Sequence, residues 1–282
     1  MANLTENQLK AIELLATYKY LTSSQFVKMG VFKKRSYLTN SLKILIDSKN
    51  SFILKHDFNP INGKVESLYF LTRNGKKLLV NQFSYDETKI KMPSGMATVY
   101  LHDYYHRRYT IDFHIAFRLW LESRNGVIEF LNYYFDKAGN NRCGNDHVTP
   151  LNRIQLDERT SIIPDINAKF IIEDKVHLFL FEQHNGNDTK RLFEQVYMHI
   201  LAISTKAVSS KYNYKKPYKI VVVCEKSSVK DSVIQRLKKE SGIEYYDSFF
   251  LFKTNDELEE NFYRNWTLIS GEKVDFLNEQ KV

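Results

Sequence analysis

The chain has 282 residues, of which 43% are hydrophobic, 14% aromatic and 26% charged, so it is neither disordered nor collagen-like. Its two Cys exclude a disulfide framework, and no Cys/His cluster has the spacing of a structural zinc site. No apolar run approaches the roughly 18 residues of a membrane span, and the first residues lack the pattern of a signal peptide, so we expect a cytoplasmic protein without a membrane partner.

The positive charge of the chain belongs to its first third. Residues 1–95 contain 15 Lys and Arg against 7 Asp and Glu, a net charge of +8, whereas residues 96–282 contain 26 of each type. A basic domain joined to a neutral one is typical of an anion-binding module attached to a second domain. We therefore divide the chain into a basic domain over residues 1–82, a linker over 83–98 and a second domain over 99–282.

Residues 1–82 predict three helices followed by a two-stranded hairpin. Thr5 can cap the first helix, Gly30 ends the second, and the third is expected over Ser36–Leu45. Two short strands flank a polar turn, with the second at Ser67–Leu71. This order is that of a winged helix-turn-helix domain. The segment after the hairpin resembles the end of the wing in bacterial winged-helix regulators, on the residues Tyr69, Leu71, Thr72, Gly75 and Leu78.

In a winged helix the third helix enters the major groove of double-stranded DNA. Basic side chains at its entrance can neutralise phosphates, and Asn or Ser can reach base edges. Lys64, at the tip of the wing, can contact a phosphate. The remaining predicted DNA-binding residues are Lys33, Lys34, Arg35, Ser36, Tyr37 and Asn40. The alternative is that this basic run is only a solvated face and that the domain contacts protein.

The second domain reads as α/β with a mixed sheet. A long helix is expected first, then three strands, a helix, a strand, a helix, a strand and a terminal helix. Asp136–Arg159 is expected to be a long loop. The predicted elements are the helix Thr98–Ser123, the strands Val127–Phe135, Ile162–Ile172 and Val176–His184, the helix Asp188–Ile203, the strand Lys219–Cys224, the helix Ser228–Glu240, the strand Ser248–Phe252 and the helix Asp256–Phe262.

Two acidic residues stand out on the paired strands of this domain. Asp165 begins one strand, and Glu182 lies near the end of the next, two residues before His184. Glu182 and His184 share a strand face because side chains alternate. Two carboxylates on adjacent strands offer an oxygen-rich site for Mg²⁺ or Mn²⁺, and a third group can then orient the attacking water.

Pro164-Asp165 followed by Glu182-x-His184 resembles the PD-(D/E)xK nuclease superfamily, a restriction-endonuclease-like mixed-sheet fold. With the winged helix ahead of it, the chain resembles the replication-relaxation family of mobile elements, which includes plasmid relaxases. Members carry a His-x5-Asp pattern, matched here by His106 and Asp112, and a Glu-x-Asp-x-Gly pattern, matched by Glu182 to Gly186. The resemblance implies a protein that nicks DNA at an origin-like site, with metal ligands Asp165 and Glu182. Partners could include mobilisation or replication proteins and a second copy of the chain.

His184 stands where the superfamily has Lys and the family has a second acid. Lys169 lies on the same strand face as Asp165 by even spacing and could supply the missing charge, as could Lys190 or Arg191 at the start of the next helix. Glu122 is an alternative to Asp112 as the acid of the long helix.

Three functions remain open from sequence. The first is metal-dependent nicking of mobile-element DNA, with Asp165, Glu182, His184, Asp112, His106 and Lys169 as the candidate catalytic residues. The second is a non-catalytic replication initiator or regulator with a degenerate nuclease-like domain. The third is a protein-interaction adaptor, which would show no salt-dependent DNA affinity.

Overall fold

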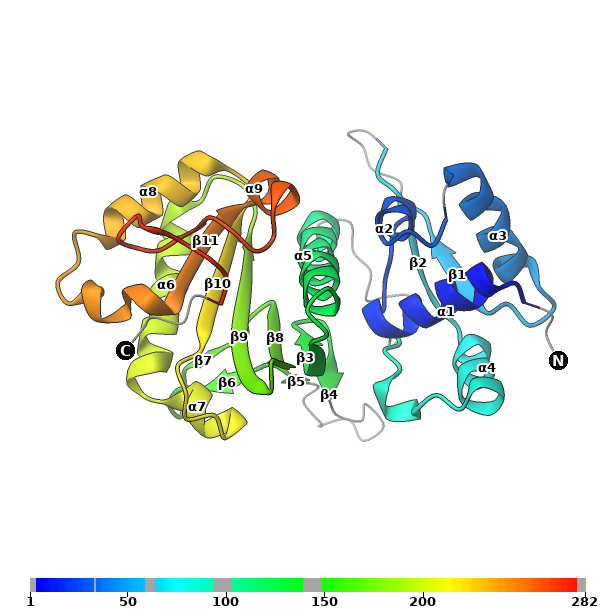
Figure 1. Ribbon diagram of the computed structural model, residues 1–282, viewed down its shortest axis with the longest axis horizontal. Coiled ribbons are helices and arrows are strands. Elements are labelled where there is room, and N and C mark those ends of the chain that lie inside the picture. Colours follow the sequence, from blue (N-terminus) through cyan, green and yellow to red (C-terminus); the bar gives the residue numbers. More distant parts are fainter. Residues whose placement is uncertain (1–3, 33, 59–63, 94–102, 139–148, 278–282) are drawn as a thin grey trace. The chain divides into compact units, whose positions relative to one another are not determined.

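The computed structural model describes residues 4–32, 34–58, 64–93, 103–138 and 149–277 (Figure 1). The chain forms two compact units, Met1–Asp112 and Phe113–Val282. The division falls inside helix α5, Tyr104–Glu122, whereas the sequence placed the boundary in a linker before that helix. Part of that linker is ordered as a 3₁₀ turn, η1, over Glu87–Lys89, and residues 94–98 lie outside the described residues. No helix in the described ranges is long and apolar enough to cross a membrane.

The first unit has the predicted order of helices and strands. Its two strands pair antiparallel, with Ile53 opposite Leu71, and an isolated bridge joins Leu21, between the first two helices, to Tyr69. The bridge ties the helices to the hairpin. The elements are α1 Glu6–Tyr18, α2 Ser23–Lys28, α3 Arg35–Asp47, β1 Ile53–His56, β2 Leu68–Leu71 and α4 Arg73–Phe83.

Threonines begin three of these helices. Thr5 and Thr22 each form a capping box with a Gln three residues later, and Thr72 accepts a hydrogen bond from the Gly75 amide at 3.0 Å. These side chains satisfy amides that the first helical turn leaves without partners. Gly75 is required by packing, because a Cβ there would collide with the carbonyl oxygen of Phe52. The Thr-x-x-Gly pattern therefore has two structural causes: Thr72 caps helix α4, and Gly75 allows the backbone of Phe52 to pack closely against that helix.

The second unit is built on a seven-stranded sheet in the order β13-β12-β11-β10-β9-β8-β3. Strands β3, β8 and β9 are antiparallel neighbours, whereas β9, β10 and β11 are parallel. The sheet strands are β3 Val127–Tyr133, β8 Ile166–Ile172, β9 Lys175–His184, β10 Lys219–Cys224, β11 Phe250–Thr254, β12 Trp266–Thr267 and β13 Lys273–Val274.

Helices cover both faces of this sheet (Figure 1). On one face, Phe113 and Phe117 of α5 pack against the rings of Phe179 and Phe181. On the other face, the apolar side chains of α6 and α8 share a core with Leu180 of β9 and the inward residues of β10. The remaining helical elements are α6 Thr189–Ser204, α7 Ala207–Tyr212, α8 Ser227–Leu237, η5 Ile243–Phe249 and α9 Asn255–Glu260.

The structure differs from the predicted second domain in several details. Helix α7 and strands β12 and β13 were not expected, and the strand expected from Ser248 begins at Phe250. The expected strand Ile162–Ile172 is interrupted, because Pro164 has no amide hydrogen to donate to a ladder, and β8 begins only at Ile166. The expected loop Asp136–Arg159 contains short paired strands. These are β4 Lys137–Ala138, which pairs with β5 Thr149–Pro150, and β6 Ile154–Gln155, which pairs with β7 Ser161–Ile162 just after the loop. Residues 139–148 lie outside the described part of the chain.

Candidate functional site

Asp165 and Glu182 lie side by side on neighbouring strands. Ile166 pairs with Phe181, so the same register continued by one residue places Asp165 opposite Glu182. The Asp165 amide also donates to the Phe181 carbonyl at 2.9 Å. Both side chains are buried, with 6% of Asp165 and 2% of Glu182 exposed. The structure thus brings together the two acids that the sequence singled out.

Two residues of helix α6 hold the carboxylate of Glu182. Oε1 lies 2.6 Å from Nε2 of His199, and Oε2 accepts a hydrogen bond from the side-chain amide of Gln195. Gln195 and His199 are one helical turn apart, so both reach the same point of β9. Helix α6 is positioned by Asp188, which caps it by accepting from the Arg191 amide at 2.9 Å. Both oxygens of Glu182 are therefore engaged by α6.

His199 is the residue of this site that sequence reasoning missed. It is 1% exposed and lies on the apolar stripe of α6, near Leu192 and Val196. Burial lowers its pKa to about 4, and the Asp165 carboxylate only partly opposes that shift. A neutral His199 still binds Glu182, because its Nε2–H can donate to the carboxylate, and no described residue bonds to Nδ1. The sequence does contain a signal for it, because the helical spacing of Leu192 and Val196 places His199 on the buried face of α6.

Asp165 and His184 are also held within the second unit. Oδ2 of Asp165 accepts the backbone amide of Gln183 at 2.7 Å. His184 is fully buried at the end of β9 and follows Glu182 by two residues, so the alternation of the strand places it on the same face. His184 thus lies on the face that the sequence predicted, inside the protein.

Lys169 is not brought to the carboxylates. Its ammonium binds Glu129 of β3 at 2.9 Å, and Lys169 lies four positions after Asp165, about 13 Å along the strand. Lys190 lies 3.8 Å from Glu194 on an exposed part of α6, and Arg191 is exposed. None of these three cations has a contact with Asp165 or Glu182 that could replace the superfamily lysine.

Asp112 and His106 belong to the first unit. Oδ1 of Asp112 accepts a hydrogen bond from Gln25 at 3.0 Å, and Oδ2 lies 3.8 Å from Arg108. The backbone carbonyl of His106 accepts from the Thr110 hydroxyl at 2.8 Å. The catalytic role that the resemblance implies for His106 and Asp112 stays a prediction. Glu122, the alternative acid, pairs with Arg118 at 2.7 Å near the exposed end of α5.

The predicted Mg²⁺ or Mn²⁺ site requires carboxylate oxygens that are open to a hard cation and its water ligands. Glu182 has both oxygens engaged by α6, and Asp165 accepts a backbone amide. Across the described ranges, no group of three or more His, Cys, Asp or Glu side chains is arranged to hold a metal ion. The site as described does not fit such a cation, and metal binding stays a prediction.

Three of the predicted DNA-contacting residues, Ser36, Tyr37 and Asn40, lie on the polar face of α3. Leu38, Leu42 and Leu45 are buried, as predicted, while the opposite face is exposed and Tyr37 is 61% exposed. Lys34 precedes the helix without capping it through its side chain. Lys33 and the side chain of Arg35 lie outside the described residues. The exposed residues of the predicted set are Lys34, Ser36, Tyr37, Asn40 and Lys64.

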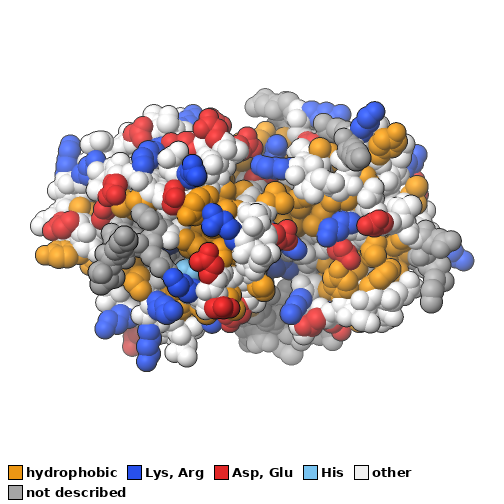
Figure 2. All heavy atoms as spheres, in the orientation of Figure 1, with side chains coloured by type: hydrophobic (Ala, Val, Ile, Leu, Met, Phe, Trp, Pro, Cys, Tyr) orange, Lys and Arg blue, Asp and Glu red, His pale blue; other side chains and the backbone are white. Residues whose placement is uncertain are grey.

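Lys43 was missed in the sequence, although it lies one turn after Asn40 and is exposed. On the face that Figure 2 shows, Lys and Arg side chains are interspersed with acidic and hydrophobic ones rather than gathered into one patch. Any DNA contact on that face would depend on particular side chains rather than on a broad basic surface.

Comparisons of the chain with protein-family models, with curated proteins and with solved structures found no match.

Proposed function

We propose that the chain binds double-stranded DNA through helix α3 of its first unit. The observation that carries this proposal is the polar face of α3, which follows directly after Lys34 and exposes Ser36, Tyr37 and Asn40. The net charge of +8 over residues 1–95 supports it, because a polyanion attracts such a module. The winged-helix interpretation is supported by the hairpin and by the bridge between Leu21 and Tyr69.

In this proposal the residues of α3 have different roles. Ser36 and Asn40 reach base edges in the major groove, since an amide can pair with the donor and acceptor of adenine. Lys34 and Lys43 bind phosphates and position the helix. Lys64, in the segment that leads into β2, binds a further phosphate. Base contacts set sequence preference, whereas phosphate contacts set affinity and its salt dependence.

The test is selection of bound sequences from a random duplex pool, followed by fluorescence anisotropy on the selected duplex. Asn40→Ala should weaken binding to the selected duplex and relax the base preference, because it removes a bidentate contact. Lys64→Ala should weaken binding to all duplexes equally and reduce the salt slope. An unchanged preference in Asn40→Ala would remove α3 as the reading element.

A second candidate function is DNA nicking by the second unit, as the resemblance to the PD-(D/E)xK superfamily and the replication-relaxation family implies. One observation favours it: Asp165 and Glu182 are neighbours across β8 and β9. The contacts of Glu182 with Gln195 and His199 favour the non-catalytic alternative instead. We therefore propose a DNA-binding regulator or initiator as the primary function.

The two candidates separate in one assay. Supercoiled plasmid carrying the selected site is incubated with the full chain and Mg²⁺ or Mn²⁺, and relaxed circles are scored. Nicking that is lost in both Asp165→Asn and Glu182→Gln would establish the second candidate. Plasmid that stays supercoiled while anisotropy shows binding supports the first.

A further inference from the structure

The second unit contains a cavity where strand β9 projects beyond β10. Strand β9 begins at Lys175, but its pairing with β10 begins only at Phe179. The segment between α7 and β10 passes this projecting end, and the Tyr214 hydroxyl donates to the Val176 carbonyl at 3.0 Å. A cavity of about 380 Å³ remains between them. That volume lies in the range of small-molecule sites, roughly 300–1,000 Å³.

Aromatic rings form much of the wall of this cavity. Phe179 and Phe276 are buried with ring centroids 6.0 Å apart, and Phe170 stacks on the ring of His177 at 5.2 Å. All four residues line the cavity. Flat rings offer both faces and edges to another flat apolar group, so the wall suits an aromatic body better than a branched aliphatic one.

The cavity also has a cationic rim, and none of the described residues that line it is acidic. Lys175 and Lys216 are exposed at its edge, and Lys219 lies deeper, where its ammonium donates to the Ser248 carbonyl at 2.6 Å. Burial lowers the pKa of Lys219, and Asp247 opposes that shift. A bound anion would stabilise the charged form of this lysine further.

We propose that this cavity binds a small organic anion with a flat aromatic body, such as an aromatic carboxylate or sulfonate. The rings hold the body, Lys175 and Lys216 hold the charged group at the rim, and Lys219 adds positive charge deeper in the cavity. Charge-assisted hydrogen bonds from Lys to a carboxylate are the stronger kind, so the charged group fixes the orientation of the ligand.

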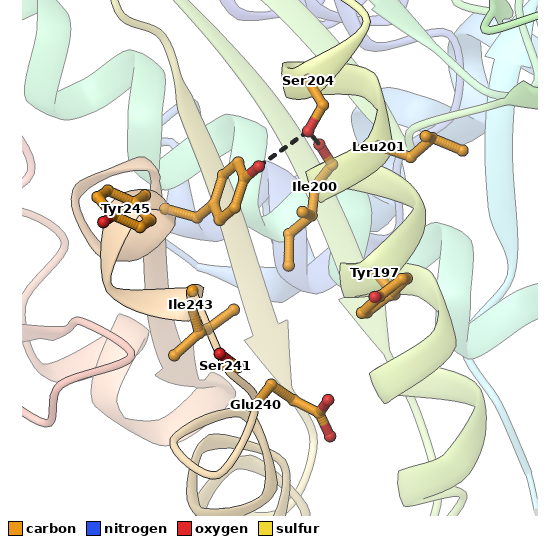
Figure 3. Close-up of a pocket in the computed structure, with 10 residues that line it drawn as sticks. Tyr197, Ile200, Leu201, Ser204, Glu240, Ser241, Ile243 and Tyr245 are labelled. Carbon is orange, nitrogen blue, oxygen red and sulfur yellow. Dashed lines mark hydrogen bonds between the residues drawn. The ribbon is translucent and has the colours of Figure 1, made fainter.

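A second cavity in the same unit provides an internal contrast (Figure 3). It has about 360 Å³ and lies between α6 and the segment that leads from α8 into η5. Tyr197 and Tyr245 line it, and Ser204 is hydrogen-bonded to Tyr246 at 2.9 Å. Among the described residues that line it, Glu240 is the only charged one, so it offers aromatic surface without a cation and should reject an anion.

Titration of the full chain with the fluorescent probe anilinonaphthalene sulfonate tests the proposal. Lys216→Glu should weaken binding of the probe about tenfold, because it replaces an attractive charge at the rim with a repulsive one. Lys215→Glu is the matched control, since Lys215 is exposed, adjacent and absent from the cavity lining. It makes the same change in net charge and should alter the affinity less than twofold, because a solvent-exposed charge outside the cavity is screened.

A neutral analogue of the probe, phenylnaphthylamine, separates charge from apolar contact. Its affinity should be the same in Lys216→Glu as in the parent chain. Leu277→Trp, which fills the cavity without changing charge, should reduce binding of the sulfonate. Equal effects of Lys215→Glu and Lys216→Glu, or no effect of Leu277→Trp, would overturn the assignment of the cavity as an anion site.

Discussion

The two units of this protein differ in where their candidate functional polar residues lie, at the surface in the first unit and in the interior in the second. In the first unit, α3 buries its leucines and presents Ser36, Tyr37 and Asn40 to solvent. In the second, Asp165, Glu182 and His199 are buried. Asp165 accepts a backbone amide of β9, and His199 of α6 contacts the carboxylate of Glu182. A polar group at a surface is available to a partner, whereas a buried one must be satisfied by the protein itself. The polar side chains of α3 are therefore open to the partner proposed above, whereas those of the second unit are satisfied by contacts within it.

The largest expected effect concerns Glu182. Glu182→Leu removes the acceptor of both His199 and Gln195 and leaves their donors buried, which should lower the free energy of unfolding by about 3 kcal/mol or more. Glu182→Gln keeps an acceptor and should cost less than half of that. Tryptophan fluorescence during urea unfolding measures the change selectively, because Trp120 and Trp266 both lie in the second unit.

The stability of Glu182→Leu tests whether the buried acids of the second unit serve structure. A Glu182→Leu chain that is as stable as the parent would mean that the carboxylate is kept for chemistry rather than for structure. DNA affinity provides the control, since the first unit should bind the selected duplex equally well in all three chains.

The second prediction concerns pH and His199. Its pKa is about 4 in the folded chain and about 6.5 when unfolded, so the unfolded state binds the proton first as pH falls. The second unit should therefore lose stability progressively from pH 6.5 to 4, by up to about 3 kcal/mol at roughly 1.4 kcal/mol for each pH unit of difference. His199→Gln should flatten this part of the stability curve.

Urea midpoints followed by tryptophan fluorescence at a series of pH values check the pH prediction. His56→Gln is the matched control, because His56 lies in β1 of the first unit and should leave the curve unchanged. A curve that keeps its slope in His199→Gln would assign the proton to another group.

These predictions rest on contacts that the sequence could reveal only in part. Alternation places Glu182 and His184 on one face, and the antiparallel pairing makes Asp165 a neighbour of Glu182, as expected. Periodicity likewise identifies the buried leucines of α3. Local patterns of this kind depend on residues close in sequence, so one chain contains enough information to predict them.

The partner of Glu182 could not be found in this way. His199 lies 17 residues further along, and its contact depends on how α6 packs across β9. Even spacing also predicted Lys169 on the same strand face as Asp165. In the structure Lys169 lies too far along the strand to reach Asp165, and its ammonium binds Glu129 instead. A pattern indicates the side of an element that a residue occupies, but tertiary packing decides what it meets.

The third prediction concerns the exposed polar face of α3 in the first unit. The double change Lys34→Glu and Lys43→Glu reverses two exposed charges, one just before α3 and one on it, and should weaken DNA binding about 100-fold at low salt. The control is a double change of equal charge at Lys10 and Lys28, on α1 and α2, which should weaken binding far less. Fluorescence anisotropy with the selected duplex measures both. Equal losses in the two variants would mean that net charge, and not the face of α3, decides the affinity.

The smallest effect concerns a polar residue of the first unit that does face inward. Thr72 accepts from the Gly75 amide at 3.0 Å and donates to the Ser51 carbonyl at 2.6 Å. Thr72→Ala should lower the stability of the first unit by about 1 kcal/mol, the usual contribution of an N-cap, and Thr72→Ser should restore most of it. Hydrogen exchange of the α4 amides reports the loss, while tryptophan fluorescence of the second unit should not change. If Thr72→Ser is as destabilising as Thr72→Ala, the methyl group of the threonine, rather than its hydroxyl, stabilises the start of α4.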